Sequence, residues 1–154
     1  MMRIAEKSGL LEAMEQRMQP VLNFLFPEIP GNHPSRKSIA TNLLANILGL
    51  GWAATPAGLK AMEELADLEE ERRRKKQRAV PIGAASNEMC DFLILNISSL
   101  QLIPVSIIAF RTEYGSVAPT AIVGPAILAT AVSTGIAIFY IKIRKYIYRK
   151  LFDR

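Results

Sequence analysis

Seven polar side chains in or beside two long uncharged stretches are the residues of this sequence best suited to bind a small polar ligand. They are Asn42, Asn46, Thr55, Asn87, Glu88, Asn96 and Gln101. Amides both donate and accept hydrogen bonds, and Glu88 is the carboxylate close to them. The same residue types also hold membrane helices together through bonds between helices. Ligand binding and helix packing are therefore both open interpretations of this set.

Enzymatic and metal chemistry lack the residues they would need. The Gly-Leu-Gly of residues 49–51 is not followed by the Gly-Lys-Ser/Thr of a phosphate loop. The single histidine, His33, and the single cysteine, Cys90, offer neither a base for a nucleophile nor a set of zinc ligands. We therefore predict no catalytic residues, no metal site and no cofactor.

The first uncharged stretch, residues 38–59, is long enough to cross most of a bilayer as a helix, but its sequence predicts a break. Gly49 and Gly51 loosen the helix, and Thr55 followed by Pro56 is typical of a helix start. We expect one half-helix over 38–50 and a second from Pro56 onward. Backbone groups freed by such a break must be buried in protein or line a polar cavity.

Two further apolar segments follow. Residues 92–110 carry no charge, contain Asn96 and Gln101, and are interrupted by Pro104, which predicts a bent membrane helix after a cap at Ser86 or Asn87. Residues 120–141 form the third segment, whose many small residues allow close helix packing. The sequence thus predicts an all-α, multi-pass membrane protein with discontinuous helices.

Charge is segregated into three clusters, at residues 3–17, 60–78 and 142–154, and the formal net charge is +5. Basic residues beside apolar segments are typical of cytoplasmic loops that face anionic lipid. We therefore predict a cell (inner) membrane protein with a cytoplasmic C-terminus and no nucleic-acid partner. Whether residues 38–59 cross or re-enter stays open.

The remaining sequence predicts an amphipathic helix over residues 2–18, an ordered turn region from Pro20 to Pro34, and a charged helical arm over 57–78. The arm is expected to be solvated and to carry ion pairs four residues apart. These pairs are Glu69 with Arg73, Glu70 with Arg74 and Glu71 with Lys75.

Four motifs in order resemble the spore maturation protein A family, within the group of membrane proteins that carry a nucleoside-recognition, or Gate, domain. The motifs are RIAEKSGL at 3–10, LFPEIPGNHP at 25–34, ANILGLGWAATPAGLKAM at 45–62 and SNEMCDFLILNISSLQLIP at 86–104. Two features depart from the family pattern. Trp52 stands where asparagine is usual, and the expected leading membrane segments are missing, which predicts a shortened start.

The sequence predicts three segments: an amphipathic helix and proline-rich loop at 1–37, a membrane domain at 38–141 with its arm at 60–80, and a basic tail at 142–154. The resemblance implies that the membrane domain is of the Gate type. GWAATP and SNEMCDF are similar to the discontinuous-helix motifs of concentrative nucleoside transporters. The implied role is dehydration of the spore core, with a spore maturation protein B-type partner and transport or gating of a nucleoside-like solute. The alternatives are an assembly subunit without transport activity and a peripheral soluble helical bundle.

Overall fold

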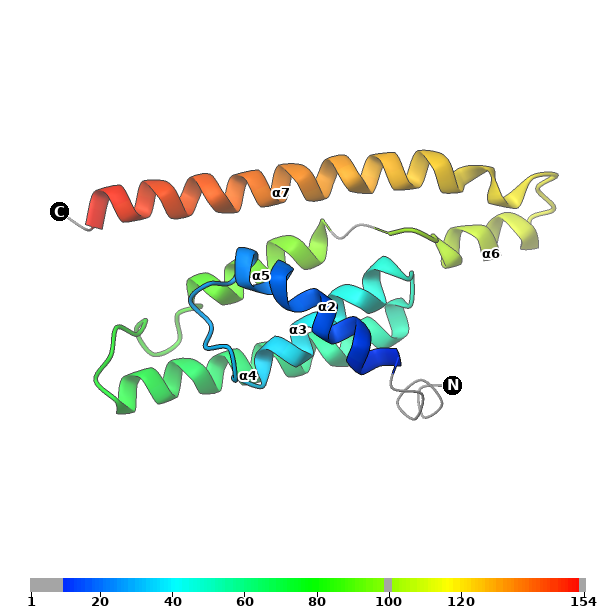
Figure 1. Ribbon diagram of the computed structural model, residues 1–154. Coiled ribbons are helices and arrows are strands. Elements are labelled where there is room, and N and C mark those ends of the chain that lie inside the picture. The colour runs from blue at the N-terminus through cyan, green and yellow to red at the C-terminus, as the bar shows by residue number, and fades with distance from the viewer. Residues whose placement is uncertain (1–9, 99–100, 153–154) are drawn as a thin grey trace. The chain divides into compact units, whose positions relative to one another are not determined.

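The computed structural model describes residues 10–98 and 101–152, and every regular element in these ranges is helical. The all-α prediction is therefore confirmed for the described chain (Figure 1). The elements are α2 (Leu10–Leu25), α3 (Ser35–Ile47), α4 (Gly51–Arg74), α5 (Asn87–Ile97), α6 (Val105–Glu113), the 3-10 helix η1 (Pro119–Ile122) and α7 (Val123–Phe152).

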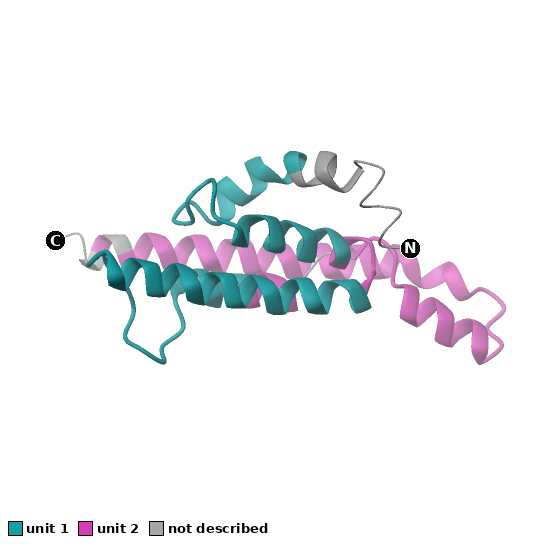
Figure 2. Ribbon diagram, turned by 90° about the horizontal axis from the view of Figure 1, so that it is seen from below, with its two compact units in different colours: residues 1–45, 51–92 teal, residues 46–50, 93–154 magenta. Residues whose placement is uncertain are grey.

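The chain divides into two compact units (Figure 2). Unit 1 comprises residues 1–45 and 51–92, and unit 2 comprises residues 46–50 and 93–154. The polar residues predicted to form a site are thus distributed between two units. Each unit is described by itself.

α2 continues through Pro20 to Leu25, so the predicted turn region from Pro20 begins too early. A proline inside a helix costs about 3 kcal/mol because it removes one backbone hydrogen bond and crowds the preceding turn. Leu22 and Leu25 are buried, and each buried leucine contributes about 1.5–3 kcal/mol. Packing of the turn that follows Pro20 therefore outweighs its local effect. The first eight residues of the predicted 2–18 helix lie outside the described residues.

The predicted break in the first apolar stretch is confirmed, but its position differs. α3 ends at Ile47 and α4 begins at Gly51, so Pro56 lies inside α4 and does not start it. The Thr55 hydroxyl donates to the Gly51 carbonyl oxygen at 3.1 Å, one turn earlier in the same helix, and Thr55 is not the N-cap. Gly49, with φ +72°, ends α3 because glycine adopts this left-handed conformation without strain.

α4 ends at Arg74 in a Schellman motif, in which Gln77 N donates to Arg72 O at 2.9 Å and Lys76 N donates to Arg73 O at 3.0 Å. Lys76 takes the left-handed position of this motif, with φ +53°. A lysine there is unusual, because glycine normally fills this position.

Two of the three ion pairs predicted on the arm are present. Glu70 pairs with Arg74 at 3.4 Å and Glu71 with Lys75 at 2.5 Å, whereas Arg73 pairs with Glu70. Glu69 is instead buried and faces inward, so the arm is not solvated on all sides as expected.

The second apolar segment is broken as predicted, with α5 ending at Ile97 and α6 beginning at Val105. The predicted cap at its start is also confirmed, since Met89 N donates to the Ser86 hydroxyl at 3.3 Å. The breaks at 48–50 and 98–104 both fall in unit 2.

One helix of the described residues is long and apolar enough to cross a membrane, and it runs from Pro119 to Tyr148. Its 30 residues span about 45 Å at 1.5 Å per residue, more than the roughly 30 Å of a bilayer core. α7 continues past Ile141 into the basic segment as one helix. The multi-pass arrangement stays a prediction.

Candidate functional site at two helix breaks

The two helix breaks meet inside unit 2, where a backbone hydrogen bond joins them. Leu102 N, in the second break, donates to Ile47 O at the end of α3 with a length of 2.8 Å. Helix ends leave such carbonyls without an intrahelical partner, so this bond joins one interrupted helix to the other.

Gly49 allows the first break to approach the second this closely. A Cβ atom at position 49 would lie 2.0 Å from Ile103 O and 3.3 Å from Val105 Cγ2. No side chain fits at the first of these distances. Glycine is therefore required at position 49 for two reasons, the left-handed φ and the close contact with the backbone of Ile103.

The Asn46 and Asn96 side chains form a direct amide pair beside this contact. Asn46 Nδ2 donates to Asn96 Oδ1 at 2.7 Å, although the residues are 50 positions apart. Both side chains are partly buried. Two of the seven predicted residues are thus brought together at the place where the helices are broken.

α7 supplies the partners for backbone groups freed by the second break. Thr130 Oγ1 accepts from Gln101 N at 3.2 Å, and Thr134 Oγ1 donates to Ser98 O. The threonines are four residues apart, so they lie on one face of α7. Hydroxyl groups of a neighbouring helix are a known means of satisfying backbone at a break in a membrane protein. Gln101 enters the site through its backbone.

Asn42 and Thr55 have different roles in unit 1. The buried Asn42 side chain donates from Nδ2 to Ala54 O at 2.8 Å and so ties α3 to the first turn of α4. Thr55 is exposed and bonds within its own helix. Asn87 is exposed at the start of α5.

Glu88 belongs to a buried ion cluster in unit 1. Its carboxylate lies 2.8 Å from Arg72 Nη1, and Glu69 lies 2.5 Å from the same nitrogen. Arg72 Nη2 also donates to Glu28 O at 2.9 Å, and Val80 N donates to Glu69 Oε2 at 3.0 Å. The cluster joins the end of α4, the start of α5 and two loops.

Burial lowers the pKa of Arg72, but the hydrogen bond and charge of Glu88, followed by those of Glu69, raise that pKa by more. The net pKa of Arg72 is above its ordinary value, so the guanidinium stays charged at every physiological pH. Glu88 thus neutralises a cation of the protein itself, a role that differs from ligand binding.

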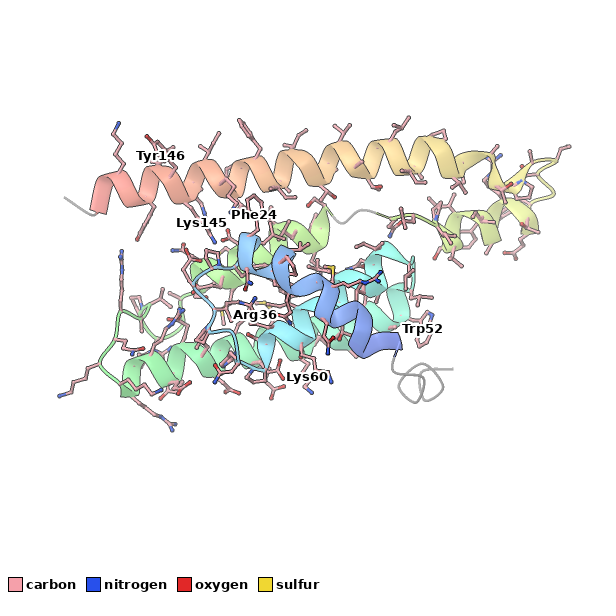
Figure 3. All side chains as sticks on the ribbon, viewed as in Figure 1. Phe24, Arg36, Trp52, Lys60, Lys145 and Tyr146 are labelled. Carbon is pink, nitrogen blue, oxygen red and sulfur yellow. The ribbon has the colours of Figure 1, made fainter. Side chains whose placement is uncertain are left out.

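The sequence analysis missed Arg36, Thr130 and Thr134 as interaction centres. Arg36, in the first turn of α3, is 4% exposed, and its side chain is directed toward α2 (Figure 3). It donates to Gln19 Oε1 at 3.3 Å, to Ile29 O at 3.1 Å and to Asn23 Oδ1. The two threonines had a readable signal, namely hydroxyls four residues apart in an apolar helix. Arg36 had none, because its partners are neutral and distant in sequence.

Comparison with known proteins places this chain in a family. No family model matches the chain, and no solved structure matches it. The chain is 45% identical over 150 residues to spore maturation protein A of Bacillus subtilis (strain 168), a match that covers 97% of this chain and 70% of the relative. An identity this high over nearly the whole chain shows common ancestry, and the chain belongs to the spore maturation protein A family.

Proposed function

We propose that this protein acts in spore maturation from within the cell membrane. The family relationship supports the biological role, and the apolar helix from Pro119 to Tyr148 supports membrane association. Basic residues at the end of that helix, together with Tyr140, Tyr146 and Tyr148, are typical of an anchor in an anionic membrane surface. The implied outcome is dehydration of the spore core, with the C-terminal tail in the cytoplasm.

At the molecular level, the proposed activity is transport or gating of a small polar, nucleoside-like solute at the two helix breaks. The observation that carries this proposal is the Asn46–Asn96 amide pair beside the Leu102–Ile47 backbone bond. Membrane transporters commonly place their substrate sites where discontinuous helices meet, because polar groups are available there in an apolar surrounding. A solute that takes the place of either amide would separate the two breaks.

The second candidate function is that of an assembly subunit in a complex with a spore maturation protein B-type partner. One observation favours it: Asn46, Asn96, Thr130 and Thr134 bond to groups of the same chain. Bonds of this kind stabilise membrane helix packing by about 0.6 kcal/mol each, so a rigid subunit would use the same residues.

Paired substitutions separate these functions. Asn46→Leu and Asn96→Leu each remove one member of the amide pair, and Asn87→Ala is the matched control because that amide is exposed outside the pair. Uptake of a labelled nucleoside into vesicles and recovery of membrane complexes are then measured for each variant. Solute handling predicts loss of uptake by the two leucine variants with complexes intact. Loss of complexes, with no uptake even by the unaltered protein, would support assembly instead.

A further inference from the structure

α3 and α4 run in opposite directions, so the uncharged stretch of residues 38–59 reverses its direction (Figure 1). Near the turn, Asn42 bonds to Ala54 O, which pairs the last part of α3 with the first turn of α4. Away from the turn, Arg72 in the last turn of α4 bonds to Glu28 O, which lies in the loop that precedes α3. Both contacts lie within unit 1.

One exposed face of α4 changes abruptly from apolar to charged. Positions 52, 56, 59, 63 and 70 share this face, because a helix has 3.6 residues per turn. Trp52 is 65% exposed and Leu59 is 69% exposed, with the exposed Pro56 between them. Glu63 and Glu70 follow on the same face. Figure 3 shows Trp52 projecting from the first turn of α4.

α3 and the apolar start of α4 are each too short to cross a bilayer. α3 has 13 residues, or about 20 Å, and the apolar start of α4 from Gly51 to Leu59 measures about 13 Å. A bilayer core is roughly 30 Å thick. Exposed charged residues stand at the open end of this helix pair, with Lys37 in the first turn of α3 and Lys60 directly after the apolar start of α4.

We propose that α3 and the first turns of α4 form a re-entrant hairpin that enters the bilayer and returns to the side from which it came. In this hairpin, the exposed face formed by Trp52, Pro56 and Leu59 contacts the hydrocarbon of the lipid. The inference rests on the membrane location in the proposed function and does not depend on any solute. Exposed apolar groups at the turn and charges at the open end match the gradient of polarity across one leaflet.

Trp52 is the single tryptophan of the chain and therefore reports on this surface without a label. The full chain is reconstituted into phosphatidylcholine–phosphatidylglycerol vesicles with brominated acyl chains, which quench tryptophan only on contact with lipid. Trp52 is expected to lose most of its fluorescence to the brominated chains and to be shielded from aqueous iodide. Shielding from iodide without quenching by bromine would mean that protein covers this face, and would overturn the proposal.

Two variants calibrate the measurement. W52F/L128W moves the tryptophan to a position of α7 that is 70% exposed, where brominated lipid should quench it. W52F/E63W moves it down the same face of α4 into the charged part, where iodide should quench it. If L128W is quenched by lipid and Trp52 is not, the hairpin alone is wrong. If neither is quenched by lipid, the membrane location in the proposed function is wrong as well.

Sidedness gives an independent test of the same inference. In a Cys90→Ser background, Lys37→Cys and Lys60→Cys are labelled separately with a membrane-impermeant maleimide in sealed vesicles of one orientation. A re-entrant hairpin predicts that both positions are labelled from the same side. Labelling from opposite sides would show that the stretch crosses the bilayer and would overturn the inference.

Discussion

At the scale of single residues, Gly49 carries the closest backbone approach between the two breaks. Gly49→Ala is expected to lower the free energy of unfolding by more than about 1–2 kcal/mol, since the left-handed φ alone costs this much for a residue with a Cβ atom. The clash with Ile103 O adds to that cost. Thermal unfolding of the purified protein in detergent measures the change.

Gly51→Ala is the matched control for this prediction. Gly51 is helical, and a Cβ atom there would meet nothing within 4 Å. Alanine favours a helix over glycine by up to about 1 kcal/mol, so this variant should be unchanged or slightly more stable. Equal destabilisation by the two substitutions would contradict the close approach at Gly49.

Substitutions at Lys76 and Gly115 are expected to change stability in opposite directions. Both residues occupy the left-handed position at the end of a helix, with φ +53° and +71°. Lys76→Gly should raise the free energy of unfolding by about 1 kcal/mol, and Gly115→Ala should lower it by a similar amount, because only glycine is unstrained there. Chemical or thermal unfolding checks both. A loss of stability in Lys76→Gly would show that its side chain makes a contact worth more than the strain.

At the scale of elements, α7 stabilises the second break through Thr130 and Thr134. Replacing each by valine keeps the shape of the side chain and removes the hydroxyl that bonds to Gln101 N or Ser98 O. Each substitution should cost about 0.5–2 kcal/mol. Ser133→Ala, on an exposed position of the same helix, should have little effect in the same unfolding measurement. Equal effects at all three positions would argue against specific capping.

The Arg72 cluster fixes the end of α4 to the start of α5. Arg72→Met leaves Glu69 and Glu88 buried without their cation, and such a loss typically costs about 3–5 kcal/mol. Glu71→Gln removes an exposed ion pair with Lys75 and should leave stability near neutral pH almost unchanged. A comparison of unfolding temperatures tests this, and equal effects would show that the cluster is not coupled to folding.

The Glu71–Lys75 pair has a defined response to pH. The hydrogen bond from Lys75, and then its charge, lower the pKa of Glu71. A carboxyl whose pKa is lowered by folding stabilises the protein above its unfolded pKa, and this contribution is lost as the pH falls through the lowered value. The small difference in free energy of unfolding between Glu71→Gln and the unaltered protein should therefore become smaller as the pH falls. Unfolding followed at stepwise lower pH measures this difference.

At the scale of the whole molecule, local sequence signals identified where helices are interrupted. Gly49 and Pro104 marked both breaks, because glycine and proline act on the backbone at their own positions. They failed at Pro20 and Pro56, where the helix continues because burial of neighbouring residues outweighs one lost hydrogen bond.

Contacts between distant segments were harder to predict from the sequence. Asn46 and Asn96 could be predicted as members of one polar set, but their direct bond depends on how the chain folds back over 50 residues. The pairing of Glu88 with Arg72 was not predicted, because it arises where the arm turns its buried face toward the start of α5. Sequence patterns predict which side chains are polar and where helices end, whereas the partner of each side chain follows from tertiary folding.

The most direct measurement is cross-linking between positions 46 and 96 in native membranes. In a Cys90→Ser background, N46C/N96C is treated with a short bifunctional thiol reagent, and N46C/I97C is the control because Ile97 is 87% exposed next to Asn96. Contact between the two breaks predicts an intrachain cross-link in the first variant and much less in the second. Absence of the cross-link in N46C/N96C, with both thiols reactive singly, would contradict the meeting of the broken helices.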